Sequence, residues 1–350
     1  MLAFDPSAVA VLDPVAPLAE APVAWKHIVA PVEPFLQATA ERLHDQISAF
    51  EKDIAAYAEY ALTGQGKQLR PALVALSGGA AGQVNDSHVL VAVIIEMVHL
   101  ATLVHDDVMD EARLRRGRPT LAAQWGSEIS VLLGDCLFAH ALKLAASFPT
   151  TEICRAVAAA TNTVCSGEIL QTQLRKNFAM TRAEYFKVLQ MKTGELFALS
   201  CDLGAYLSGA GAAPRSALRH YGMALGTAYQ VFDDCLDLFG TESAVGKSLG
   251  TDLAKGKLTL PLLLALEQAS PEERARMERW VAHWEPSSLP PLLKLLETHG
   301  ALEGSRRSVH QHLLAAQQSL TILPESEGRT GLAALTGYLG RQTDALGVLR

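Results

Sequence analysis

The chain lacks most of the features that mark secreted, membrane-spanning or nucleic-acid-binding proteins. Its 350 residues include five cysteines, an odd number without a Cys-x-x-Cys pair, which favours a reduced cytoplasmic chain over a disulfide-bonded one. The net charge of −7 disfavours nucleic acid as a partner, because its phosphates would be repelled. The longest apolar runs are too short, or too interrupted by Glu96 and His99, to span a bilayer, so we expect no stable membrane insertion.

Signals for strands, repeats and a targeting segment are also missing. Residues 1–25 contain no Lys or Arg, unlike signal and transit peptides, and we interpret them as a flexible N-terminal tail. From residue 26 to 350 a helical periodicity dominates, without an alternating strand pattern or a short internal repeat. Breaks are expected at Gly78-Gly79, at Phe148-Pro149 and within 209–211 and 287–291. The sequence therefore predicts one all-α domain, an antiparallel helical bundle.

Two clusters of aspartate stand inside apolar helical patterns. The first comprises Asp106, Asp107 and Asp110, and the second repeats the same Asp-Asp-x-x-Asp spacing at Asp233, Asp234 and Asp237. Carboxylates among Leu, Val and Phe are strongly destabilising unless a cation neutralises them. On a helix the first and third members of each cluster share a face, which presents oxygens without forming a cage. Magnesium suits such an incomplete site, because it is commonly shared between a few carboxylates and substrate phosphates.

Basic residues in loop-like stretches fit a phosphorylated ligand. A guanidinium matches phosphate geometry, and glycine-containing stretches let backbone amides approach phosphate oxygens. No adenine-binding loop accompanies these stretches. The candidate phosphate-binding cations are Lys67, Arg70, Arg115, Arg116, Lys192, Lys247 and, in the stretch 252–257, Lys255 and Lys257.

Taken together, these segments resemble the trans-isoprenyl (polyprenyl) diphosphate synthases. The likeness runs from about residue 40 to the C-terminus in the order of the family's motifs. It is carried by the two aspartate clusters, Gly66-Lys67-x-x-Arg70-Pro71, Arg115-Arg116-Gly117-x-Pro119-Thr120, Lys192-Thr193 and Gly256-Lys257-x-Thr259-Leu260-Pro261. The resemblance implies an isoprenoid-synthase bundle around a deep central cavity. It also implies a magnesium-dependent transferase that condenses isopentenyl diphosphate with an allylic diphosphate, commonly as a homodimer.

The resemblance also implies a role for each matching residue. Asp106 and Asp110, with Asp107 beside them, would hold magnesium on one side of the allylic diphosphate. Asp233, supported by Asp234 and Asp237, would hold another ion on the opposite side. The allylic pocket would be completed by Arg115, Lys192, Lys247 and Lys257. Isopentenyl diphosphate would lie in a metal-free subsite made by Lys67, Arg70, His99 and Arg116. Gln171 would lie near the metal-bound waters, while Thr193 and Gln230 would offer oxygen dipoles to the developing carbocation. Gln65 and Gln68 depart from the family pattern, which puts the strength of isopentenyl diphosphate binding in doubt.

Product length depends on the helix that leads to the first aspartates. Short-chain relatives place an aromatic ring at the floor just before that cluster, whereas this chain has the small residues Ala101 and Thr102. The prenyl tail should therefore pass them and stop one or more turns deeper, near Met97, Ile94 or Phe138. We expect a product longer than geranylgeranyl diphosphate. The sequence leaves the final length, the allylic primer and any need for a second subunit open.

Other readings of the same residues remain. A short-chain farnesyl or geranylgeranyl synthase would keep every motif. A terpene cyclase shares the fold and first cluster but usually has a different second metal motif, and a head-to-head condensing enzyme needs another arrangement of aspartates. A non-catalytic partner subunit or scaffold typically loses its aspartates. At single positions, His99 alone would be an ordinary polar core residue, and Ala101 would be simple close packing.

Overall fold

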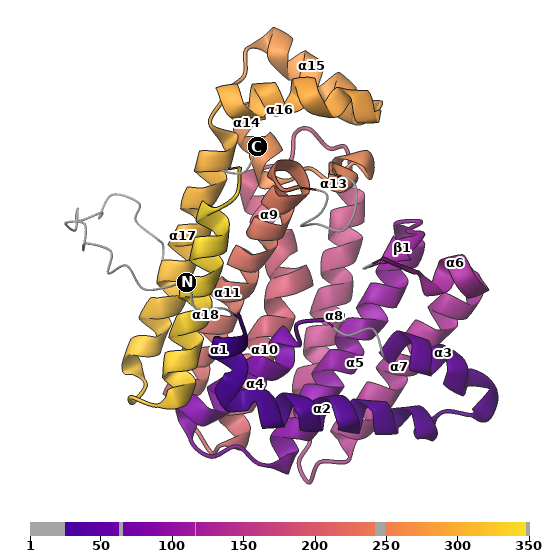
Figure 1. Ribbon diagram of the computed structural model, residues 1–350, viewed down its shortest axis with the longest axis vertical. Helices are drawn as coiled ribbons and strands as arrows, with labels where there is room; N and C mark the ends of the chain where they lie inside the picture. Colours follow the sequence, from indigo (N-terminus) through magenta and orange to yellow (C-terminus); the bar gives the residue numbers. More distant parts are fainter. Residues whose placement is uncertain (1–24, 63–65, 116, 242–248, 348–350) are drawn as a thin grey trace.

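The computed structural model describes residues 25–62, 66–115, 117–241 and 249–347, and these are mostly α-helical (Figure 1). The first half contains α1 (Trp25–Val29), η1 (Ala30–Val32), α2 (Glu33–Asp45), η2 (Gln46–Ala49), α3 (Lys52–Leu62), α4 (Leu69–Ala81), α5 (Asp86–Met109), β1 (Leu114–Arg115), β2 (Arg118–Pro119), α6 (Leu121–Trp125), α7 (Ser127–Ala146) and α8 (Glu152–Gln173). The second half contains α9 (Arg182–Leu189), η3 (Gln190–Gly194), α10 (Glu195–Leu207), α11 (Ala212–Phe239), α13 (Thr251–Ala254), α14 (Leu260–Gln268), α15 (Pro271–Ala282), η4 (Pro286–Ser288), α16 (Leu289–Thr298), α17 (Ala301–Ser319), η5 (Leu320–Ile322) and α18 (Glu327–Asp344).

The long helices pack into a bundle with two large apolar clusters. One cluster surrounds α11, α14, α17 and α18, and the other surrounds α5, α7 and α8. Helices α4 and α10 contribute to both clusters: Leu73 and Phe197 belong to the first, Val74 and Leu199 to the second. These two helices pack against each other, and α10 also packs against α11 (Figure 1). They therefore join the two halves of the bundle and set how α5 and α11 lie relative to each other.

Both aspartate clusters stand near the C-terminal ends of long helices. Helix α5 begins with a capping box formed by Asn85 and His88 and runs for 24 residues, ending next to Asp110. Helix α11 runs for 28 residues and ends at Phe239, two residues after the second cluster. The C-terminal end of a helix carries a partial negative charge, so carboxylates there are disfavoured unless cations lie close by.

One irregular turn interrupts the path from α9 to α10. Residues 190–194 (η3) form a π-helical turn that contains Lys192 and Thr193. Such single π-turns within α-helices are common at functional sites, because the extra residue changes where the side chains point. The turn packs against both α8 and α11, and it thereby brings Lys192 and Thr193 between these two helices.

The predicted helix boundaries are confirmed in part. The breaks at Phe148-Pro149 and 209–211 lie between helices, and 287–291 covers η4 and the proline-containing first turn of α16. The break at Gly78-Gly79 is wrong, because α4 continues to Ala81. These glycines serve close packing: a Cβ on Gly78 would lie 2.9 Å from the His88 ring. The sequence also did not indicate the small hairpin, in which Leu114 pairs with Pro119 and Arg115 with Arg118.

Within the residues that the structure describes, α5 and α7 are long and apolar enough to cross a membrane by length and composition. The expectation that the apolar runs are too short is therefore wrong by this criterion. In the structure 61% of the apolar window of α5 is buried, where it packs against α2, α4, α7 and α10, compared with 39% for α7. Most of the apolar surface of α5 is therefore buried by packing within the bundle, whereas a larger part of the apolar surface of α7 is exposed.

The junction of the two halves gives a testable prediction. A Cβ on Gly204 of α10 would lie 2.5 Å from the carbonyl oxygen of Val74 on α4, and backbone cannot move aside as a side chain can. We expect Gly204→Ala to lower the free energy of unfolding by about 1–3 kcal/mol. Gly337→Ala in α18 is the control, because its Cβ would meet only the end of Arg341 at 3.4 Å. It should be neutral or stabilising by up to ~1 kcal/mol. Equal unfolding curves for both variants would contradict this packing argument.

Candidate active site

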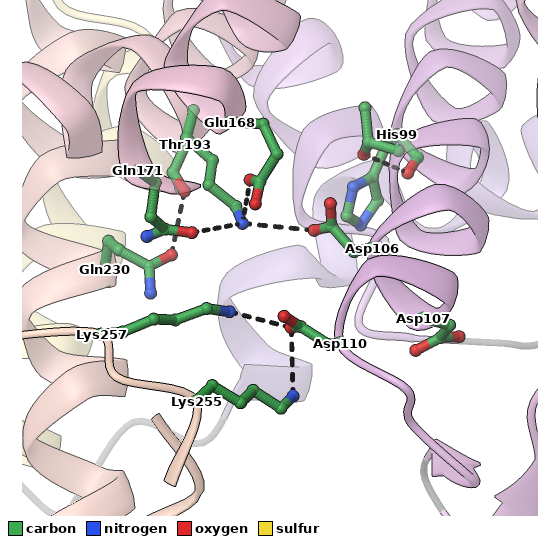
Figure 2. A network of polar contacts seen from close by, with 12 residues as sticks. His99, Asp106, Asp107, Asp110, Glu168, Gln171, Thr193, Gln230, Lys255 and Lys257 are labelled. Atoms are coloured by element: carbon green, nitrogen blue, oxygen red, sulfur yellow. Dashed lines mark hydrogen bonds and ion pairs between the residues drawn. The ribbon is translucent and has the colours of Figure 1, made fainter. Parts of the chain in front are cut away.

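The side chains of the first aspartate cluster point in two directions. Asp106 and Asp110, one turn apart on α5, point toward α8 and η3, whereas Asp107 lies on the other side of the helix (Figure 2). Asp107 accepts hydrogen bonds from Nε of Arg115 at 2.9 and 3.0 Å and forms an ion pair with its Nη2 at 2.8 Å. Burial raises the pKa of Asp107, and Arg115 offsets this only in part. The first and third aspartates are therefore presented together, as expected, while the second is held by Arg115.

Lys192 connects the first cluster to α8. Its ammonium forms an ion pair with Glu168, donates to Oε1 of Gln171 at 3.0 Å and lies 3.4 Å from Oδ2 of Asp106 (Figure 2). Burial alone would lower the pKa of Lys192, but the charges of Asp106 and Glu168 outweigh it and raise the pKa. Lys192 is thus a buried, protonated cation placed beside the metal-binding candidates.

Asp110 is surrounded by three cations from elsewhere in the chain. Arg175 Nη2 lies 2.9 Å from its Oδ1, while Lys255 and Lys257 lie 3.0 and 2.8 Å from its Oδ2 (the lysines are shown in Figure 2). Burial would raise the pKa of Asp110, but the charges of Lys257 and then Lys255 lower it to about 2. Asp110 is therefore ionised and fully neutralised by protein groups in this structure.

The second cluster is built into the protein more deeply. Asp234 accepts from the Tyr185 hydroxyl at 2.6 Å and from Nε2 of Gln230 at 3.0 Å. Its burial, followed by the charge of Asp252, raises the pKa of Asp234 to about 8. Asp237 accepts from the Thr251 hydroxyl at 2.7 Å and from the backbone N–H of Asp252 at 3.1 Å, and so holds the start of α13. Asp233 is the exposed member of this cluster.

A hollow of about 570 Å³, including space open to solvent, lies beside these groups. Its lining combines polar residues from α8, η3 and α11 with apolar residues from α9. Thr193 donates to Oε1 of Gln230 at 2.9 Å (Figure 2), which fixes the amide so that its Nε2 faces Asp234. The residues that line the hollow are Gln171, Leu174, Met180, Tyr185, Val188, Leu189, Lys192, Gln230, Asp234, Asp252, Lys257, Leu258 and Thr259.

The structure brings together many of the residues that the sequence singled out. One polar network on facing elements contains Asp106, Asp110, Gln171, Lys192, Thr193, Gln230 and Lys257, and His99 lies on α5 beside Asp106 (Figure 2). Other residues lie outside this network. Lys67 is exposed, 5.8 Å from the Tyr338 ring, and the Arg70 guanidinium lies 5.2 Å from the Phe197 ring. The isopentenyl diphosphate subsite therefore stays a prediction. Arg116, which was expected in this subsite, and Lys247, which was expected in the allylic pocket, lie outside the described residues.

The residues expected to set product length are buried in the cluster around α5. Ala101 and Met97 are 0% exposed, and Thr102 is half-buried with its hydroxyl donating to the carbonyl oxygen of His99 at 2.6 Å. None of the three lines the 570 Å³ hollow. A passage for the prenyl tail along α5 therefore stays a prediction as well.

The sequence reasoning missed Glu168, Arg175 and Tyr185, which the structure places at the site. Glu168 stands three residues before Gln171, in a stretch that was already of interest, and Lys255 was noted beside Lys257 but was given no role of its own. Arg175 follows Gln171 by one helical turn, a spacing that could have indicated it. Tyr185 had no local signal, because its contact with Asp234 joins residues from two separate helices.

The donors at the site fit magnesium shared with a ligand. Among the described residues, no three His, Cys, Asp or Glu side chains gather closely enough to hold a metal ion alone. The groups that point into the site are hard carboxylate oxygens, which suit magnesium and leave coordination positions for water and phosphate. A metal held by Asp106 and Asp110 would have to replace the cations that now pair with these two carboxylates.

Comparison with known proteins agrees with this site. Residues 51–292 match the family model described as polyprenyl synthetase. The chain is 35% identical over 310 residues to the all-trans-nonaprenyl-diphosphate synthase (geranyl-diphosphate specific) of Rhodobacter capsulatus, covering 88% of this chain and 95% of that protein. It is 36% identical over 277 residues to heptaprenyl diphosphate synthase component 2 of Bacillus subtilis (strain 168), covering 79% of each.

A solved structure matches over nearly the whole fold. It is a polyprenyl synthase from Caulobacter crescentus CB15 complexed with calcium and isoprenyl diphosphate, with a TM-score of 0.87 and 32% identity. The match covers 92% of this chain and 99% of that one. The fold is thus the all-α isoprenoid synthase fold. The chain belongs to the polyprenyl synthetase family and is a prenyltransferase.

The two aspartate-bearing helix ends should act as one unit, because both face the groups that would bind the diphosphate. Asp106→Ala and Asp233→Ala should each lower kcat by orders of magnitude, as expected when an electrostatic contact to the departing group is lost. Asp86→Asn, at the far end of α5, is the control and should keep near-normal turnover. The measurement is a steady-state rate at saturating magnesium. A near-normal rate for either alanine variant would show that the two clusters do not form one site.

Proposed function

We propose that this protein condenses isopentenyl diphosphate with an allylic prenyl diphosphate, in a magnesium-dependent reaction, to make a linear all-trans polyprenyl diphosphate longer than geranylgeranyl. The observation that carries the proposal is the arrangement of Asp106 and Asp110 on α5 against Lys192 and Lys257, with the second aspartate cluster on α11 beside the same hollow. Such a site provides both the carboxylates for a divalent metal and the cations for a diphosphate.

The six aspartates divide into two roles in this proposal. Asp106, Asp110 and Asp233 would hold magnesium, which supplies positive charge that stabilises the departing diphosphate. Asp107, Asp234 and Asp237 would position the metal-binding groups, because they are bound to Arg115, to Tyr185 with Gln230, and to the start of α13. This division keeps the expectation that Asp107 lies beside the metal-binding pair and that Asp234 and Asp237 support Asp233.

The remaining residues at the site would bind the diphosphate, face the allylic cation and exclude water from it. Lys192 and Lys257 would stabilise negative charge as the allylic carbon–oxygen bond breaks. Thr193, whose hydroxyl oxygen keeps lone pairs after donating to Gln230, and the amide oxygen of Gln230 would face the allylic cation. The apolar side chains of Leu174, Val188 and Leu189 along the hollow would exclude water from that cation. Among the described residues no side chain at the site is an obvious base for the last proton, and we assign that proton to the released diphosphate.

The names of the relatives support a long product. Those compared above are nonaprenyl and heptaprenyl diphosphate synthases, and Ala101 and Thr102 leave no bulky ring just before the first aspartates. The direct test is incubation of the purified chain with labelled isopentenyl diphosphate, magnesium, and geranyl or farnesyl diphosphate as primer. Chromatography of the dephosphorylated lipids should show a linear prenol longer than geranylgeraniol. Farnesol or geranylgeraniol would indicate a short-chain synthase, a cyclic hydrocarbon a cyclase, and no product a partner subunit.

We further propose that the protein is a cytoplasmic homodimer. Helices α7 and α8 pack together, and they expose Leu132 and Ile169 to 60% and 61%, with Val131 close by on α7. Exposed apolar side chains on neighbouring helices favour a subunit contact. The Bacillus relative is named as one component of a synthase, so a second subunit is the competing arrangement.

The mass of the protein in solution tests the homodimer. Light scattering should give twice the chain mass, and Leu132→Glu should lower it to the mass of the monomer. A monomeric wild-type chain that needs another protein for activity would contradict the homodimer.

The last prediction of this section concerns the passage for the prenyl tail. Ala101 lies five residues before Asp106, so a tail of about three isoprene units should reach it, given a rise of about 5.4 Å per helical turn. Ala101→Tyr should therefore stop elongation at farnesyl or geranylgeranyl diphosphate while the magnesium dependence stays unchanged. Ala101→Ser, which adds little volume, should keep the wild-type product.

The Ala101 position is fully buried, so the ring must also be tested for its effect on folding. Overpacking there could cost about 1–3 kcal/mol, and thermal melting will show whether the variant remains folded. If folded Ala101→Tyr protein made the wild-type distribution of products, the tail would not pass this residue.

A further inference from the structure

Three cations converge on one carboxylate at Asp110. Within the described part of the chain, Asp110 is the only carboxylate at ion-pair distance from Arg175, Lys255 and Lys257. The three side chains carry three positive charges, and Asp110 carries one negative charge. Taken by themselves, these four side chains therefore have a net charge of about +2. A folded protein keeps such an excess most easily where an anionic ligand binds.

The backbone holds the three cations as one unit. Arg175 follows the C-terminal end of α8, and the N–H of the next residue, Lys176, donates to the carbonyl oxygen of Gly256 at 2.7 Å. Gly256 is the residue between Lys255 and Lys257. It has a φ of +74°, and a Cβ on it would lie 2.7 Å from Cγ of Lys176. This close contact places Arg175 beside the two lysines, although they are 80 or more residues apart in sequence.

Arg175 also has donor capacity that the described protein does not use. Its Nη2 donates to Asp110, but its Nε is buried and has no hydrogen-bond partner within the described part of the chain. A buried N–H without a partner is costly, and a guanidinium binds a phosphate with two parallel donors. The Arg175 side chain is 24% exposed and that of Lys255 is 30% exposed, so both are accessible to a ligand from solvent. Of the three cations, Lys257 lines the 570 Å³ hollow.

We propose that Arg175, Lys255 and Lys257 form a diphosphate-binding cluster, which Asp110 occupies as an internal anion when no ligand is bound. This inference rests on the proposed function for the identity of the ligand, and it adds Arg175 and Lys255 to the binding residues. When diphosphate takes the three cations, Asp110 is released toward the metal. The cluster thereby couples binding of the anion to completion of the metal site.

The test measures binding of inorganic diphosphate to the full-length protein by titration calorimetry, with EDTA present and no metal. Removing the competing carboxylate should free the cations, so Asp110→Asn should bind diphosphate several-fold more tightly than wild type. Arg175→Gln/Lys255→Gln should bind it about tenfold more weakly or worse, because two charge-assisted contacts are lost. The single variant Lys255→Gln, at the more exposed of the two positions, should weaken binding by a smaller factor.

A matched control distinguishes diphosphate binding at this cluster from a general effect of the protein's net charge. Arg182→Gln/Lys187→Gln on α9 removes the same two charges, and Arg182 pairs with Glu267 at the surface, so it should bind diphosphate as wild type does. Thermal melting will show that each variant is folded. The proposal is overturned if Asp110→Asn does not tighten binding, or if a folded variant lacking Lys255, alone or with Arg175, binds no more weakly than the control. Because no turnover is measured, these results are independent of which product the enzyme makes.

Discussion

The site depends on one electrostatic constraint: carboxylates are concentrated at the C-terminal ends of two long helices, where the helix dipoles are also negative. Asp106 and Asp110 close α5, and the second cluster lies in the last two turns of α11. Neither location favours negative charge, and each cluster includes members that are largely buried. Cations from other segments, namely Arg115, Lys192 and the lysines after α13, neutralise the first cluster. Hydrogen bonds from Tyr185, Gln230 and Thr251 hold the buried members of the second cluster instead.

The same constraint explains why the site spans the bundle. Lys257 precedes α14, in the half of the molecule that contains α11 and α17, yet its ammonium lies 2.8 Å from Asp110 in the half that contains α5. Helices α4 and α10, whose apolar residues belong to both cores, join these halves. The apolar cores thus bring together carboxylates and cations from both halves of the bundle. An anionic substrate with divalent metal would satisfy both sets of groups at once.

Much of this could be predicted from the sequence. The repeated aspartate spacing defines a shared helix face, and it correctly indicated that Asp106 and Asp110 point the same way. Lys192 and Lys257 stood in recognisable motifs and were found at the site. Arg175 was missed, and Lys255 was given no role of its own, because the position of both depends on a backbone contact between Lys176 and Gly256, which joins distant segments. The glycines of α4 were misread as a helix end, because only the packed structure shows that His88 needs the space.

The central claim is that both aspartate clusters hold divalent metal around one diphosphate. The most direct measurement is anomalous diffraction from manganese in crystals grown with a non-hydrolysable allylic thiodiphosphate. We predict manganese peaks between the diphosphate and Asp106 with Asp110 on one side, and between the diphosphate and Asp233 on the other. Asp110 should no longer contact Arg175 or Lys255 in that complex. Manganese bound at only one cluster, or a diphosphate that contacts neither Lys192 nor Lys257, would contradict the account.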